Sequence, residues 1–83
     1  MEITVLKFGL PHCAPCKTLS KILEDMEGIT EINVSEDLEL GKKYGIQKVP
    51  TLVFLKNGEE VYRKNGLITK STYEEVINNI NNN

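Results

Sequence analysis

Apolar residues form two kinds of pattern along this chain. Short, mostly apolar runs rich in β-branched residues occupy residues 3–8 (ITVLKF), 29–34 and 51–56 (TLVFLK). Such runs are typical of strands, and an unbroken apolar run indicates a strand that is buried on both faces. Elsewhere apolar residues recur every three or four positions, as they do along one face of an amphipathic helix. The pattern therefore predicts strands and helices in alternation.

The clearest helical pattern follows the first strand and runs from Cys13 to Glu27. Pro15 falls in the first turn of this helix, where its missing N–H costs nothing. Gly28 follows the helix and is expected to end it in the C′ position. The apolar stripe consists of Leu19, Ile22, Leu23 and Met26.

Two further helices are expected, a short one and the last one. The short helix is expected to be capped by Ser35 and closed by Gly45, and its acidic first turn and basic last turn suit the helix dipole. The last helix begins at Ser71, through a capping box, or at Thr69. The Asn-rich end, residues 78–83, is expected to fray. The apolar stripe of the last helix consists of Tyr73, Val76, Ile77 and Ile80.

The order of these elements defines a topology. Asn57 and Gly58 mark a hairpin turn between the strand at 51–56 and a fourth strand at 60–64. The first half of the chain needs a right-handed parallel crossover, whereas the hairpin makes the second half antiparallel. We therefore predict an α/β fold with a four-stranded mixed sheet (βαβαββα), helices on both faces, and one domain over residues 1–83.

Composition narrows the classes of partner. The chain has 83 residues, of which 27% are charged, and a net charge of −2. Nucleic-acid binding requires a clustered positive field, so we expect no such partner. No apolar run approaches the ~20 residues of a membrane helix, and the N-terminus shows no signal-peptide pattern. We therefore expect a cytoplasmic protein without a membrane partner.

Candidate chemistry is concentrated in two cysteines, Cys13 and Cys16, at the predicted start of a helix. Free N–H groups and the helix dipole lower the pKa of a cysteine at that position. Cys13, at the exposed start, is the expected nucleophile toward a substrate disulfide. Cys16, one turn further in, would then attack the mixed disulfide and release the reduced product. Their spacing is compatible with a disulfide, which would close too small a loop to act as a structural staple.

The two cysteines allow two other interpretations. An incidental pair is disfavoured, because C-x-x-C between a strand and a helix is a specific signal. A zinc site needs four protein ligands, or three and an open position, and His12 is the sole histidine. We therefore expect no metal site within one chain, whereas a cluster shared by two chains remains open.

The sequence resembles the thioredoxin family over nearly its whole length. The resemblance lies in Cys13-Ala14-Pro15-Cys16-Lys17, Lys43-Tyr44-Gly45-Ile46, Val49-Pro50-Thr51, Phe54-Leu55-Lys56-Asn57-Gly58 and Gly66. It implies a reductant of protein disulfides that binds no cofactor, receives electrons from NADPH through a reductase, and is expected to act as a monomer. It also implies a cis bond between Val49 and Pro50 opposite the disulfide, and a substrate groove formed by His12, Ala14, Pro15, Val49, Pro50 and Gly66.

The chain departs from the family pattern in two places near the motif. It lacks the N-terminal strand and helix of longer members, and His12 stands where the family usually has Trp. His12 either tunes the charge near the thiols or is an ordinary loop histidine. The short length leaves a glutathione-dependent glutaredoxin as the alternative, although Ala14-Pro15 is the thioredoxin type of dipeptide. A non-catalytic interaction module is disfavoured because both cysteines are present.

A third departure concerns charge. The family usually buries an Asp six residues before the first cysteine and pairs it with a Lys on the neighbouring strand, but here Lys7 and Glu31 occupy these positions. We hypothesise an inverted ion pair beneath the cysteines. A charged Lys7 would favour the thiolates, whereas a neutral one would accept the Cys16 proton, and Glu31 could relay protons in either case. The alternative is that Lys7 reaches solvent and Glu31 is an ordinary surface residue.

Overall fold

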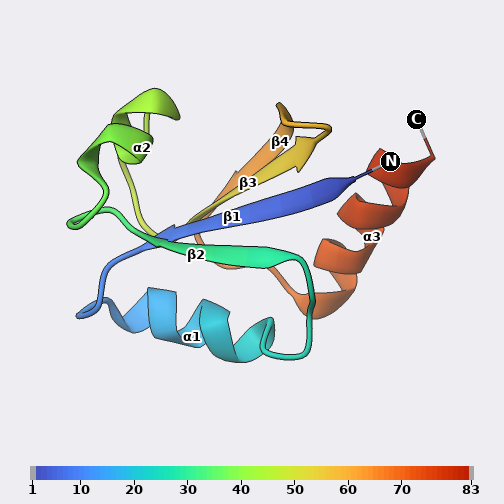
Figure 1. Ribbon diagram of the computed structural model, residues 1–83. Coiled ribbons are helices and arrows are strands. Elements are labelled where there is room, and N and C mark those ends of the chain that lie inside the picture. The colour runs from blue at the N-terminus through green and yellow to red at the C-terminus, as the bar shows by residue number, and fades with distance from the viewer. Residues whose placement is uncertain (1, 83) are drawn as a thin grey trace.

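The computed structural model describes residues 2–82, and its elements follow the predicted βαβαββα order. The sheet has four strands in the order β2-β1-β3-β4 (Figure 1). β1 pairs in parallel with β2, while β3 pairs antiparallel with β1 and with β4. The predicted mixed sheet is therefore confirmed. The elements are β1 (Ile3–Gly9), α1 (Ala14–Ile22), β2 (Ile29–Asn33), α2 (Leu38–Lys43), β3 (Thr51–Lys56), β4 (Glu59–Asn65) and α3 (Lys70–Asn81).

Helices cover both faces of the sheet, α1 and α3 on one face and α2 on the other (Figure 1). Because successive side chains of a strand point to opposite faces, β1 contributes Val5 to the α1/α3 core and Leu6 to the α2 core. Lys7 follows Leu6 and so faces α1. Across residues 2–82, no helix is long and apolar enough to span a membrane.

The first helix is shorter than its apolar stripe predicts. α1 ends at Ile22 instead of Glu27, with Leu23 as its C-cap. The next residues include Glu24 and Asp25, whose negative charges oppose the dipole at a helix C-terminus. Leu23 is nevertheless buried. The apolar stripe therefore identified a core residue correctly, whereas the predicted end of the helix was wrong.

The caps of the other two helices differ in part from expectation. Asp37, not Ser35, caps α2, because its carboxylate accepts a hydrogen bond from the Leu40 N–H at 3.1 Å. Ser35 instead donates its N–H and its hydroxyl to Asn33. Thr69, one of the two candidates, caps α3 and accepts from the Thr72 N–H at 3.1 Å.

The Asn-rich end is more ordered than expected. α3 continues to Asn81, and its Ile80 is 7% exposed in the core. Lys56 of β3 also donates a hydrogen bond to the Ile80 carbonyl at 2.9 Å. The expected fraying is therefore wrong as far as Asn81, while Asn83 lies outside the described residues.

Candidate active site

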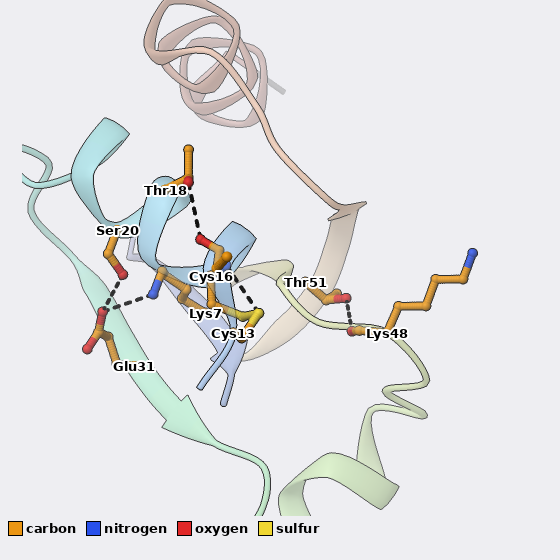
Figure 2. Close-up of a disulfide and its surroundings, with 9 residues drawn as sticks. Lys7, Cys13, Cys16, Thr18, Ser20, Glu31, Lys48 and Thr51 are labelled. Atoms are coloured by element: carbon orange, nitrogen blue, oxygen red, sulfur yellow. Dashed lines mark hydrogen bonds and ion pairs between the residues drawn. A yellow bond between two sulfur atoms is a disulfide. The ribbon is translucent and has the colours of Figure 1, made fainter. Parts of the chain in front are cut away.

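A disulfide joins Cys13 and Cys16 at the start of α1, with their Cα atoms 5.2 Å apart. Cys13 is the N-cap and has an extended backbone (φ −127°, ψ 107°). Its Sγ accepts a hydrogen bond from the Cys16 N–H at 3.2 Å (Figure 2). Cys13 is half-buried, whereas Cys16 is only 4% exposed. The more accessible sulfur therefore lies at the positive end of the helix, where N–H groups stabilise a thiolate.

Local sequence explains this placement. Pro15 lies in the first turn of α1, where its fixed φ favours helix and its missing N–H is not needed. The Lys17 N–H then donates to the Cys13 carbonyl at 3.1 Å, which closes the first helical turn. The Thr18 hydroxyl donates a hydrogen bond to the Ala14 carbonyl at 3.1 Å (Figure 2). Ala14 and Pro15 remain exposed on the outer side of the turn, and His12 is exposed just before it.

Gly9, at the end of β1, permits the close approach of Cys16. A methyl group at Gly9 would lie 3.3 Å from the Cys16 Sγ and 3.5 Å from its Cβ. The contact with the Sγ is tighter than ordinary van der Waals packing, so a larger residue would displace the sulfur or the strand. Gly9 was not among the expected site residues, although a glycine between a strand and the cysteine motif signals close backbone approach.

The loop before β3 reaches the same end of the sheet. Phe8 pairs with Thr51 in the β1–β3 register, so the residues that precede Thr51 lie beside the end of β1. The Thr51 hydroxyl donates to the Lys48 carbonyl at 2.7 Å, which ties this loop together (Figure 2).

Pro50 and Gly66 come together in this region. The bond between Val49 and Pro50 is cis, as the resemblance implies, and Pro50 is buried. The Gly66 N–H donates to the Pro50 carbonyl at 2.8 Å. Gly66 has a φ of +84°, a conformation that side chains disfavour. Pro50 and Gly66 thus lie against each other at the end of the sheet where β1 leads into the cysteine motif, and a substrate groove at this place stays a prediction.

Lys7 and Glu31 form an ion pair under α1. They face each other in the β1–β2 register, and the Lys7 Nζ donates to the Glu31 Oε1 at 3.0 Å. Hydrogen bonding to Lys7, followed by its positive charge, holds the pKa of Glu31 below its ordinary value. Ser20 donates to the same Oε1 at 3.3 Å. Ser20 was not among the expected residues, although its position one turn after Cys16 places both on one face of α1.

A cavity of about 260 Å³ connects this pair to the disulfide. Figure 2 shows the Lys7 amine, the Ser20 hydroxyl and the Glu31 carboxylate pointing toward one another beside Cys16. Within residues 2–82, no three His, Cys, Asp or Glu side chains gather in a way that could hold a metal ion. The cavity is lined by Lys7, Gly9, Leu10, Pro11, Cys16, Lys17, Ser20, Glu31, Ile32 and Asn33.

Comparison with known proteins matches this geometry to a family. The thioredoxin family model matches residues 1–79. The chain is 34% identical to a thioredoxin of Bacillus subtilis, over 92% of this chain and 80% of the relative. It is 38% identical to a thioredoxin of Rickettsia bellii, over 94% of this chain and 89% of the relative.

Solved structures of thioredoxins have the same fold as this chain. A thioredoxin variant from Halobacterium salinarum superposes with a TM-score of 0.85 at 29% identity, covering 90% of this chain and 71% of that one. The thioredoxin of Fasciola hepatica gives 0.83 at 25% identity, covering 93% and 80%.

The fold and its C-x-x-C disulfide define a thiol–disulfide oxidoreductase with a redox-active cysteine pair. The chain belongs to the thioredoxin family, and the thioredoxin interpretation is favoured over the glutaredoxin alternative.

Proposed function

We propose that this chain reduces protein disulfides in the cytoplasm and is recharged by an NADPH-dependent thioredoxin reductase. The observation that carries the proposal is the unequal exposure of the two sulfurs at the start of α1. Cys13 is partly accessible and its Sγ accepts the Cys16 N–H, whereas Cys16 is 4% exposed. This asymmetry supports Cys13 as the attacking group and Cys16 as the resolving group.

The proposed reaction transfers two electrons in two exchange steps. The Cys13 thiolate attacks one sulfur of the substrate disulfide, and the other substrate sulfur leaves as a thiolate and takes up a proton. The Cys16 thiolate then attacks the Cys13 Sγ and expels the second substrate sulfur. The substrate leaves as a dithiol and the chain as the Cys13–Cys16 disulfide. No bound cofactor is needed, because the electrons reside on the sulfurs.

We further propose that the substrate chain lies against the exposed rim of the disulfide. Ala14, Pro15 and His12 border it on one side. On this proposal the backbone of Val49, Pro50 and Gly66 would border it on the other side, and the Pro50–Gly66 hydrogen bond supports a fixed backbone shape there. An extended substrate segment would dock there by backbone pairing, which tolerates many sequences. We expect a monomer to be sufficient, since both sulfurs come from one chain.

The test is a pair of electron-transfer assays with insulin disulfides as acceptor. One supplies NADPH with a bacterial thioredoxin reductase, and the other supplies glutathione with NADPH and glutathione reductase. We expect turnover in the first and only background in the second. A Cys13→Ser variant is the matched control and should be inactive in both. Turnover with glutathione alone would overturn the proposal in favour of the glutaredoxin alternative.

A further inference from the structure

A buried cation lies beneath the disulfide. Lys7 is 6% exposed, and it contacts Glu31, whose side chain is 70% exposed. A lysine this deeply buried is maintained as an ammonium ion by a carboxylate partner, because an unpaired buried charge costs several kcal/mol. Ser20 donates to the same carboxylate oxygen and so helps to hold Glu31 in place. The contacts thus favour a charged Lys7 over a neutral one.

Lys7 shares a cavity with the buried sulfur of the active site. The cavity of about 260 Å³ is lined by both Lys7 and Cys16, and Gly9 contributes no side chain to fill it. A water molecule occupies roughly 30 Å³ in the liquid, so this space can hold several. The cavity therefore provides a path by which the Cys16 proton can leave, since Cys16 itself has almost no contact with solvent.

The charges around Cys16 do not cancel. Solvent screens the exposed Glu31 carboxylate far more than it screens the buried Lys7 ammonium. This difference in screening favours a net positive potential at Cys16 despite the ion pair. The ionisable group nearest to Cys16 is the thiol of Cys13, which titrates with it in the reduced protein. The others are Lys7 on β1, Lys17 on α1 and Glu31 on β2, with His12 in the preceding loop and Glu24 beyond Lys7.

We propose that Lys7 is a positioning residue for the resolving step: its buried ammonium stabilises the thiolate of Cys16, and Glu31 fixes that ammonium in place. The inference deepens the proposed function and rests on it, because only a resolving cysteine must ionise while it is buried. In this step the Cys16 thiol loses its proton through the cavity to solvent. The resulting thiolate forms a bond to the Cys13 Sγ, and the mixed disulfide bond breaks.

The test compares Lys7→Met and Glu31→Gln in the reduced protein. The readout is the chemical shift of the Cys16 Cβ carbon, followed by NMR as a function of pH. Lys7→Met should raise the pKa of the Cys16 thiol by about 1, since it removes an opposite charge. Glu31→Gln should also raise that pKa, by no more than Lys7→Met does, because it removes the carboxylate that keeps the Lys7 ammonium charged and in place. A merely structural ion pair would give no upward shift of the Cys16 pKa in either variant.

Two further variants complete the comparison. Lys21→Met removes the same charge from an exposed site on α1 away from the cavity and should leave the Cys16 titration unchanged. Lys7→Arg retains the charge and should stay close to wild type. At neutral pH, Lys7→Met should slow release from a preformed mixed disulfide about threefold, because tenfold less thiolate is partly offset by higher nucleophilicity.

The outcomes separate this inference from the proposed function. If Lys7→Met folds and shifts the Cys16 titration no more than Lys21→Met does, Lys7 has no such role. If Lys7→Met does not fold, Glu31→Gln decides, since its exposed site tolerates the change: an unaltered or downward titration would refute the inference. Insulin reduction with thioredoxin reductase would still support the proposed function in either case.

Discussion

At the scale of single residues, the site depends on two sulfurs with different surroundings. The Cys13 Sγ accepts a hydrogen bond from a backbone N–H at the start of α1. Cys16 packs closely against Gly9 and lines the cavity that Lys7 also lines. The motif alone identified both cysteines, because C-x-x-C at a helix start has few other uses. The closeness of Gly9 to Cys16 could not be predicted, since it depends on how the end of β1 approaches α1.

Substitution of each cysteine should separate their roles. Cys16→Ser should stop turnover and accumulate a covalent complex between Cys13 and the substrate, because nothing remains to resolve the mixed disulfide. Cys13→Ser should give neither turnover nor complex. The complex can be measured by non-reducing electrophoresis and mass spectrometry. A stable complex in Cys13→Ser, with none in Cys16→Ser, would mean that the roles are reversed.

Gly9→Ala should destabilise the oxidised protein by about 1–3 kcal/mol, the usual range for overpacking. The added methyl would lie 3.3 Å from the Cys16 Sγ. Gly41→Ala is a matched control, because a methyl there makes only ordinary contacts with Val34 at 3.8 Å and lies in α2. Alanine in a helix should stabilise the protein by about 0.5–1 kcal/mol. Urea unfolding measures both, and equal changes of the same sign would contradict the argument.

At the scale of elements, apolar periodicity predicted the existence and order of the helices and strands better than their ends. The boundary of α1 depends on charges after Ile22, and the choice between Thr69 and Ser71 depends on which hydroxyl meets a free N–H. Several residues near a helix start have equally suitable side chains. Local sequence therefore identifies the candidate N-cap residues. The backbone conformation at the start of the helix decides which of them caps it.

Removal of the α3 cap should be measurable. Thr69→Ala should reduce the free energy of unfolding by about 1 kcal/mol, because the Thr72 N–H loses its acceptor. Ser71→Ala should change it by less than about 0.5 kcal/mol, as expected of an exposed surface position. Chemical denaturation followed by circular dichroism measures both variants. Equal losses would indicate that Ser71 contributes to the cap after all.

At the scale of the whole molecule, the sheet brings together parts of the chain that are distant in sequence. Lys7 and Glu31 are 24 residues apart and meet through the register of β1 with β2. Pro50 meets Gly66 through the β3–β4 hairpin. Periodicity does not determine register, so composition and spacing alone could not place these pairs; the family resemblance supplied the alignment. The cavity could not be predicted, because its shape depends on side chains from β1, α1 and β2.

Stability in acid is a property of the whole molecule that the ion pairs should influence. The pKa of Glu31 is lowered by Lys7, and that of Glu60 by Arg63. A carboxyl with a lower pKa in the folded state stabilises the protein above its unfolded pKa, near 4.5, and that stability is lost as pH falls through the folded value. Stability should therefore decline below about pH 4.5. The fall in the free energy of unfolding with decreasing pH should be steeper than in variants that lack these carboxylates. As the pH falls, these carboxyls take up protons in the unfolded chain before they do so in the folded one.

Glu31→Gln should flatten this decline. Because Glu31→Gln leaves the buried Lys7 ammonium without its carboxylate, the stability lost at neutral pH should exceed the ~1 kcal/mol of an exposed ion pair. In strong acid the variant and the wild type should converge, since protonated Glu31 no longer compensates the Lys7 ammonium. Glu39→Gln, at an exposed residue in the first turn of α2, is a matched control that keeps both ion pairs. Urea titrations between pH 3 and pH 7 measure the slope. A slope in Glu31→Gln equal to that of the wild type would show that the ion pair contributes nothing to acid stability.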